Sequence, residues 1–131
     1  MARLVRKLDN ARSALPAAVW EGQGAPVGII AYGSSHHAVV ESRDQLRREK
    51  GIEADYLRVR AYPFSRDVEA FLKSHERTYV VEQNRDGQLA ALVRLDIAAE
   101  LVPRLRSVAH IPGLPLDARS ITEEISAREG H

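Results

Sequence analysis

The sequence predicts a doubly wound α/β domain. Short runs of β-forming residues alternate along the chain with segments of about ten residues whose apolar positions have helical spacing, the pattern of a parallel sheet between helices. The run Val27–Tyr32 carries no charge, which is typical of a strand buried on both faces of a sheet. With 131 residues, 44% of them hydrophobic, the chain is long enough to bury one core and too short for two.

The composition excludes several classes of function. Lys and Arg number 19 against 18 Asp and Glu, so the net charge of +1 gives no uniformly basic surface for a nucleic-acid backbone. The absence of cysteine excludes disulfides, thiolate catalysis and cysteine-bound zinc or iron–sulfur clusters within this chain. No apolar run approaches the roughly 20 residues of a membrane span, and the first residues lack the apolar core of a signal peptide. We therefore expect a cytoplasmic protein with no nucleic-acid or membrane partner.

The first segment, Ala2–Leu15, has the pattern of an amphipathic helix that ends at Pro16. Its apolar stripe has spacings of three and four residues and consists of Leu4, Val5, Leu8, Ala11 and Leu15. Its other positions carry a charge of 4 − 1 = +3, from Arg3, Arg6, Lys7 and Arg12 against Asp9. We interpret residues 1–16 as an N-terminal helical linker and residues 17–131 as the α/β domain. The basic face is interpreted as a solvated surface, with an acidic partner as the alternative.

The central strand of the sheet is predicted to lie in the first part of the domain. Ala17–Glu21 is short and partly β-branched, so it is at most a brief edge strand. Val27–Tyr32 has the longest uncharged apolar run and is predicted to lie in the middle of the sheet. Ser34 or Ser35 can cap the helix that follows, which stops at Gly51.

The remaining elements continue the alternation of strands and helices. Strands are predicted at Tyr56–Ala61, Thr78–Glu82 and Ser107–Ile111. A third helix follows Ser65, ends near His75 and has Val68, Phe71 and Leu72 on its inner face. Two more helices are predicted over Gln88–Leu101 and around Ile121 and Ile125.

The turn after the predicted central strand is the first candidate site. Ligands of open α/β sheets gather beyond the carboxyl ends of the strands, and the small residues here let backbone N–H groups and hydroxyls approach an anion. The candidate anion-binding residues are Gly33, Ser34, Ser35 and His36. Plain helix capping is the simpler interpretation, because no nucleotide-binding glycine motif is present. His36 and His37 diverge by about 100° on a helix, which disfavours a shared metal.

The turn after the strand Thr78–Glu82 is the second candidate site. Its polar side chains offer complementary donors and acceptors for a subunit contact: Glu82, Gln83, Asn84, Arg85, Asp86 and Gln88. Substrate recognition is the alternative, and Glu82 and Asp86 could in principle form an acid and base pair. His75 and Glu76 are expected to be solvated. For His110 two interpretations stay open: a buried, hydrogen-bonded histidine or a functional residue.

Three stretches of the sequence resemble one known family: Val27–Ser34, Ala54–Phe64 and Tyr79–Leu89. They are similar to the C-terminal part of the α subunit of 2-oxoacid:ferredoxin oxidoreductases, the 2-oxoglutarate type in particular. The Glu-Gln-Asn-Arg-Asp-Gly-Gln stretch at 82–88 is the most specific piece. The similarity extends in order over nearly all of the chain.

This resemblance implies a transketolase C-terminal-like domain, a three-layer α/β/α sandwich on a mixed, mostly parallel sheet whose first strand is antiparallel to the rest. It implies a complete enzyme that uses thiamine diphosphate, magnesium and iron–sulfur clusters to convert a 2-oxoacid to an acyl-CoA. The chain has no Gly-Asp-Gly element for magnesium diphosphate, and no family catalytic residue maps onto it. The expected role is therefore a non-catalytic interface domain whose partners are the remaining domains or subunits and a second copy of itself. The alternative is a free-standing flavodoxin-like module that binds a small anion at Gly33 to His37.

Overall fold

The computed structural model describes residues 18–62, 64, 66–83, 86–109 and 116–130. The described residues form a five-stranded sheet in the order β1-β3-β2-β4-β5. The strands are β1 (Val19–Glu21), β2 (Val27–Tyr32), β3 (Ala54–Val59), β4 (Arg77–Glu82) and β5 (Leu105–Ala109). β1 pairs antiparallel with β3, and all other pairs are parallel. The predicted mixed sheet with an antiparallel first strand and a central Val27–Tyr32 strand is confirmed.

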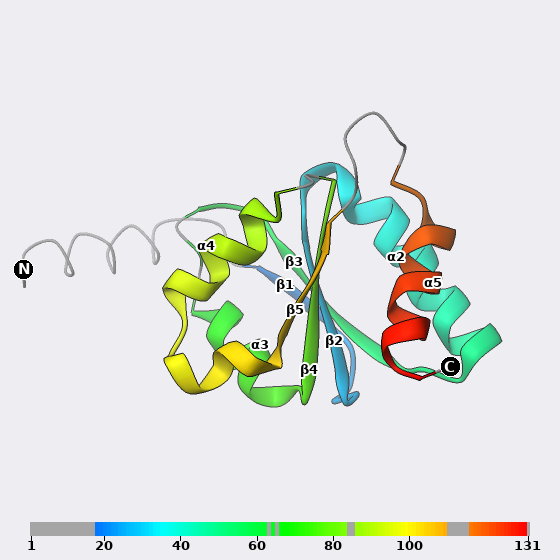
Figure 1. Cartoon of the computed structure of the whole chain (residues 1–131), viewed down its shortest axis with the longest axis horizontal. Helices are drawn as coiled ribbons and strands as arrows, with labels where there is room; N and C mark the ends of the chain where they lie inside the picture. Colours follow the sequence, from blue (N-terminus) through cyan, green and yellow to red (C-terminus); the bar gives the residue numbers. More distant parts are fainter. Residues whose placement is uncertain (1–17, 63, 65, 84–85, 110–115, 131) are drawn as a thin grey trace, which may run out of the picture.

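Helices cover both faces of this sheet, so the molecule has three layers (Figure 1). On one face lie α2 (His36–Gln45), its π-helical continuation η2 (Leu46–Lys50) and α5 (Ala118–Arg128). On the other lie α3 (Asp67–Ser74), α4 (Gln88–Asp96) and the 3₁₀ segment η3 (Ala99–Arg104). None of the described helices is long and apolar enough to cross a bilayer.

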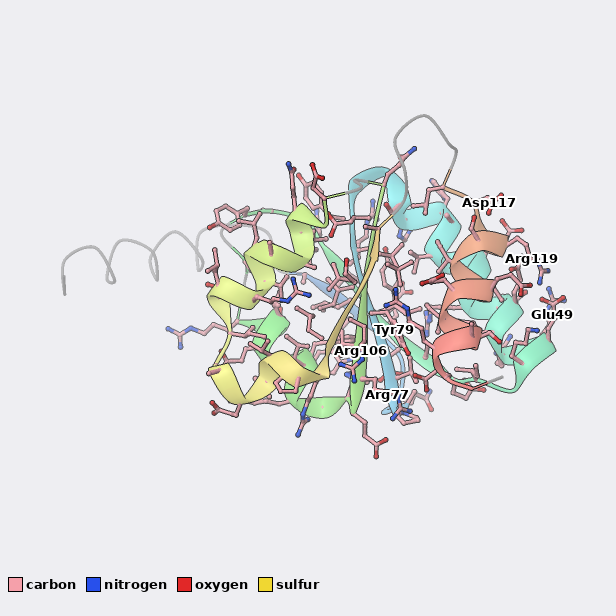
Figure 2. All side chains as sticks on the ribbon, in the orientation of Figure 1. Glu49, Arg77, Tyr79, Arg106, Asp117 and Arg119 are labelled. Atoms are coloured by element: carbon pink, nitrogen blue, oxygen red, sulfur yellow. The ribbon has the colours of Figure 1, made fainter. Side chains whose placement is uncertain are left out.

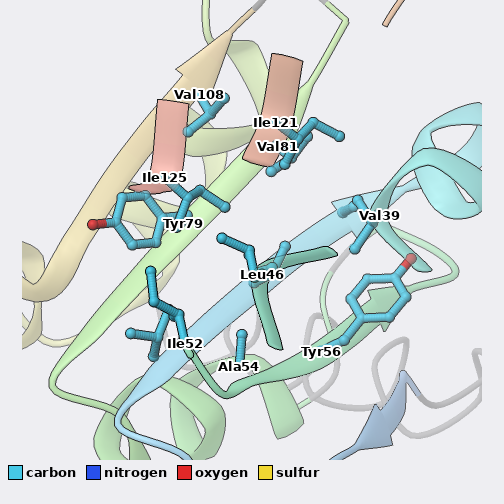
Figure 3. Packing of buried hydrophobic residues seen from close by; sticks show 13 residues of the cluster. Val39, Leu46, Ile52, Ala54, Tyr56, Tyr79, Val81, Val108, Ile121 and Ile125 are labelled. Carbon is cyan, nitrogen blue, oxygen red and sulfur yellow. The ribbon is translucent and has the colours of Figure 1, made fainter. Parts of the chain in front are cut away.

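The sheet separates two hydrophobic cores, because successive side chains of a strand point to opposite faces. Ile29 and Tyr56 belong to the cluster under α2 and α5, which Figure 3 shows from close by. Ile30 and Leu57 belong to the cluster under α3 and α4. These side chains are fully buried. Burial on both faces explains why β2 has no polar side chain before Tyr32.

α5 is fixed at both of its ends, as Figure 2 shows around the labelled residues. At its start the Asp117 carboxylate accepts a hydrogen bond from the Ser120 amide at 2.8 Å, a normal N-cap. At its end Glu129 accepts two hydrogen bonds from the Arg77 guanidinium, at 2.7 and 2.8 Å, and one from the Tyr79 hydroxyl. The C-terminal helix is thereby tied to β4.

Several predicted boundaries need correction. The side chain of Ser35 makes no capping hydrogen bond, because the 3₁₀ turn Gly33–Ser35 (η1) leads directly into α2. The fourth helix ends at Asp96, five residues early, and η3 occupies the following stretch. β5 begins at Leu105, since that residue pairs with Thr78. Residues 1–17 and Ser65 lie outside the described residues, so the predicted N-terminal helix and that cap stay predictions.

Candidate functional site at the carboxyl edge of the sheet

The fold brings the two predicted turns to neighbouring strand ends. β2 and β4 lie side by side, and Ala31 pairs with Val81 one residue before each strand ends. The crossover from β2 runs to β3 through α2 on one face, and the crossover from β3 runs to β4 through α3 on the other (Figure 1). Strand order therefore reverses beside β2, which is where open α/β sheets bind ligands.

The first turn is shaped by Gly33 and His36. Gly33 has φ 67°, in the left-handed region that favours glycine, and a side chain there would meet open space. Ser35 is buried, while the hydroxyl of Ser34 lies outside what the structure describes. His36 begins α2, and its Nδ1 lies 3.0 Å from the Tyr56 hydroxyl. The turn therefore presents backbone and one imidazole at the edge of the sheet.

The protonation of His36 follows from its surroundings. Partial burial and the nearby charge of Arg58 lower the pKa of His36, so the ring is neutral at pH 7. Burial raises the pKa of Tyr56 to about 12, so its hydroxyl keeps its proton. The protonated phenol and Nδ1 of the neutral imidazole share one hydrogen bond. In the tautomer that accepts the phenol proton at Nδ1, Nε2 carries the ring proton and can donate it to a ligand.

In the second turn the carboxylate of Glu82 is directed inward. Its Oε1 accepts from the Leu89 amide at 2.8 Å, and its Oε2 accepts from the Ala90 amide at 3.1 Å. Glu82 is buried and satisfies the first free amides of α4, where the helix dipole also favours a negative charge. These contacts with α4 explain the position of Glu82, so an acid and base pair with Asp86 is not needed to explain it.

The other residues of this turn lie differently. Gln83, Asp86 and Gln88 are exposed. Asn84 and Arg85 lie outside the described residues, and so does His110. The side chains of Gln83, Asp86 and Gln88 thus lie at the surface, whereas that of Glu82 does not.

The expectation that His75 is solvated is wrong. Its side chain is 1% exposed, with Nδ1 2.6 Å from the Phe71 carbonyl oxygen and Nε2 2.8 Å from Asp55 Oδ2. Both ring nitrogens therefore have an oxygen partner, and the ring is fixed between α3 and β3. Trp20 packs nearby, with its ring 6.0 Å from the imidazole. No local signal in the sequence marks this pair, because its members are 20 residues apart.

Asp55 completes this buried pair at the amino end of the parallel strands, opposite the two turns. Its carboxylate accepts from the amides of Gln23, Gly24 and Ala25 at 3.0–3.3 Å. Burial alone would raise the pKa of Asp55, but the hydrogen bonds from His75 and from the loop amides hold it below its usual value. The pair joins the β1–β2 loop to the end of α3, which is a structural role.

A pocket of about 200 Å³ lies between α2 and the start of β3. Its cations are already engaged: Arg43 donates to the Ala54 carbonyl oxygen at 2.8 Å and to Glu21, and Arg47 donates to Asp44. Among the residues that the structure describes, no three His, Asp or Glu side chains are placed to hold a metal ion. The carboxyl edge therefore stays the candidate site.

Comparison with known proteins shows which protein the chain is related to. No protein-family model matches it. It is 38% identical over 94 residues to the protein named 2-oxoacid:ferredoxin oxidoreductase 2, subunit alpha, of Aeropyrum pernix. The chain is homologous to this oxidoreductase α subunit. The match includes 70% of this chain and only 14% of the relative, so the chain corresponds to one part of a much longer protein. The resemblance expected from the sequence is confirmed.

Solved structures confirm the fold of this α-subunit homologue. A 2-oxoglutarate:ferredoxin oxidoreductase from Magnetococcus marinus superposes with a TM-score of 0.77 at 23% identity, over 91% of this chain and 21% of that one. A split-gene transketolase, an inactive β4 tetramer, gives 0.61 at 18% identity, over 82% and 38%. The α chain of a probable 2-oxoacid ferredoxin oxidoreductase from Thermoplasma acidophilum gives 0.56 at 22% identity, over 88% and 98%. The fold is transketolase-like.

Proposed function

We propose that this chain is a non-catalytic structural and subunit-interface domain of a 2-oxoacid:ferredoxin oxidoreductase. The observation that carries the proposal is the 38% identity to an oxidoreductase α subunit along 70% of the chain. In the complete enzyme a 2-oxoacid would be oxidatively decarboxylated to an acyl-CoA, with ferredoxin as electron acceptor. This chain would support the subunits that perform the reaction.

The side chains at the carboxyl edge support a role in protein contact. Tyr32 and Tyr62 stand at the end of β2 and beyond the end of β3, with 54% and 64% of their surface exposed. Exposed tyrosines are frequent in protein interfaces, because a rigid ring gives contact area and a hydroxyl for hydrogen bonding. The polar turn with Gln83 and Asp86 follows the neighbouring strand β4. We expect this edge to contact the remaining domains or subunits.

The cofactors of the complete enzyme would be held by those other parts. Iron–sulfur clusters are bound chiefly by cysteine thiolates, and this chain has no cysteine. The two titratable side chains best placed at the carboxyl edge, Glu82 and His36, are engaged with α4 and Tyr56. Thiamine diphosphate and magnesium would accordingly be bound by a partner subunit.

A second candidate function is the binding of a small oxyanion at Gly33 to His36. It is favoured by the start of the ten-residue helix α2 and by Arg58, an exposed cation close enough to lower the pKa of His36. No carboxylate in the described part of the chain forms an ion pair with Arg58. The function would be that of a free-standing flavodoxin-like module.

Calorimetry on the purified chain separates these two functions. Titration with phosphate, coenzyme A and thiamine diphosphate should release no heat if the chain is an interface domain. The same preparation should show no 2-oxoacid-dependent reduction of a viologen. Heat from phosphate that disappears in Arg58→Gln, with Arg47→Gln as the matched control, would instead establish the anion site.

A further inference from the structure

The carboxyl end of β3 carries two arginines that have no counter-charge within the described part of the chain. Arg58 and Arg60 are both exposed, and neither forms an ion pair with a carboxylate of the described residues. Most of the other described arginines are engaged in ion pairs: Arg43, Arg47, Arg48, Arg77, Arg119 and Arg128. The end of β3 therefore differs from the rest of the described surface, where arginine charge is mostly neutralised locally.

The side chain of Arg58 lies on the α2 face of the sheet, at its outer margin. Tyr56 points into the core beneath α2 and α5, so Arg58, two residues later on the same strand, is on that face. Arg58 pairs in register with the exposed Val19 of the edge strand β1. Glu21, the other β1 residue on this face, is paired with Arg43 at 3.3 Å. Arg58 thus lies beside an exposed apolar side chain, and the carboxylate of β1 is already taken by another cation.

Two exposed aromatic rings continue this surface across the ends of β2 and β3. Tyr32 pairs in register with Val59, the last residue of β3, so it lies directly beside the end of that strand. The ring of Tyr62 packs edge-on against the buried Phe64, with 5.1 Å between the ring centroids, which holds it in place although it is largely exposed. Arginine and tyrosine are enriched in protein interfaces and among their strongest contacts. We call this surface the β3-end patch, which consists of Tyr32, Arg58, Arg60 and Tyr62.

We propose that the β3-end patch binds a carboxylate-bearing surface of a partner subunit, with Arg58 and Arg60 as its charged anchors. This inference rests on the proposed function, because it names the chemistry of the partner that the interface domain meets. The charge favours Asp and Glu side chains on the partner, since a guanidinium buried against a neutral or basic surface loses water without gaining a counter-charge. The tyrosines favour a protein surface over a free small anion, which would leave the exposed rings uncovered.

The test measures binding of the full chain to the immobilised subunits encoded by the neighbouring open reading frames. The wild type should bind, and Arg58→Glu and Arg60→Glu should each raise the Kd by at least about tenfold, because a carboxylate then faces the carboxylates of the partner. Arg94→Glu is the matched control, since Arg94 is also an exposed cation without an ion pair among the described residues but lies in the last turn of α4. Circular dichroism checks that each variant keeps the fold.

The salt dependence of binding separates the two parts of the patch. Added salt should weaken binding of the wild type more than binding of the double variant Arg58→Gln and Arg60→Gln, because salt screens exposed charges. Tyr62→Ala should weaken binding at every salt concentration and leave the salt dependence unchanged.

The outcomes distinguish this inference from the proposed function. Binding that is unchanged in Arg58→Glu and Arg60→Glu would overturn the inference and leave the proposed function standing. No binding by the wild type would overturn both. Variants that lose self-association in sedimentation but bind the subunits like the wild type would assign the patch to a second copy of the chain and overturn the inference.

Discussion

His75 donates a hydrogen bond from Nε2 to Oδ2 of Asp55 over 2.8 Å in the interior of the domain. The relationship connects three elements, because the same carboxylate receives the amides of the β1–β2 loop and the same imidazole donates to Phe71 at the end of α3. The edge strand β1 is adjacent to this loop, and its Trp20 packs near the His75 ring. The pair therefore holds the amino-terminal part of the domain against the α3 layer.

Asp55→Asn should destabilise the domain by about 3 kcal/mol, because it removes the carboxylate that accepts hydrogen bonds from His75 and the loop amides in the interior. Chemical denaturation measures this loss. Glu49→Gln is the matched control, since Glu49 pairs with Arg119 at the exposed surface and exposed pairs contribute little. An Asp55→Asn variant with wild-type stability would show that the carboxylate of Asp55 does not stabilise the domain.

The same pair predicts an acid dependence. The pKa of Asp55 is lower in the folded chain than its usual value, so its stabilising contribution is fully present above the unfolded value, about 4, and is lost as the pH falls through the folded value. The free energy of unfolding of the wild type should fall over this range, and that of Asp55→Asn should fall less. Parallel curves for the two proteins would contradict this assignment.

Tyr56 predicts an alkaline dependence of the opposite sign. Its pKa is raised to about 12 by burial, so the folded chain keeps the phenol protonated while the unfolded chain ionises near pH 10. Its contribution is present below that value and is lost as the pH rises toward 12. Ultraviolet titration should show Tyr56 and Tyr79 as late-ionising phenols, and Tyr56→Phe should remove one of these two late ionisations. An unchanged late ionisation in Tyr56→Phe would contradict the prediction.

Gly28 is required by the packing of α3 on the sheet. A Cβ atom at this position would lie 2.5 Å from Phe71 Cε1 and 3.1 Å from the His75 ring. Gly28→Ala should therefore cost about 1–3 kcal/mol through overpacking. The cost should be smaller in a Phe71→Leu background, which frees space at the contact, and a double-mutant cycle measures the difference. Equal costs in both backgrounds would place the strain elsewhere.

Self-association is predicted through the exposed part of the turn after β4. Arg85, which lies outside the described residues, would offer a five-donor fork next to Asp86, and Arg85→Glu would replace attraction by repulsion. Sedimentation should find the wild type at least partly dimeric and the variant monomeric, with the same circular dichroism. A monomeric wild type at high concentration would assign the turn to other subunits.

The central strand and one edge strand could be predicted, because both depend on local patterns. The uncharged run of β2 identified the centre of the sheet, and the short polar-flanked β1 identified an edge. The site was harder to predict, because its contacts are long-range. Glu82 was recognised as part of a specific turn, but its inward direction depends on where α4 begins. His75 was misjudged because Asp55 comes from a strand 20 residues earlier.

The central claim is that this chain works as an interface domain of a larger oxidoreductase. Its most direct test is co-expression of an affinity-tagged chain with the products of the neighbouring open reading frames, followed by measurement of 2-oxoacid-dependent viologen reduction in the captured material. The account predicts a captured thiamine-binding subunit and activity in the complex, with none in the chain alone. Turnover by the chain alone, or an active oxidoreductase that assembles without this chain, would contradict it.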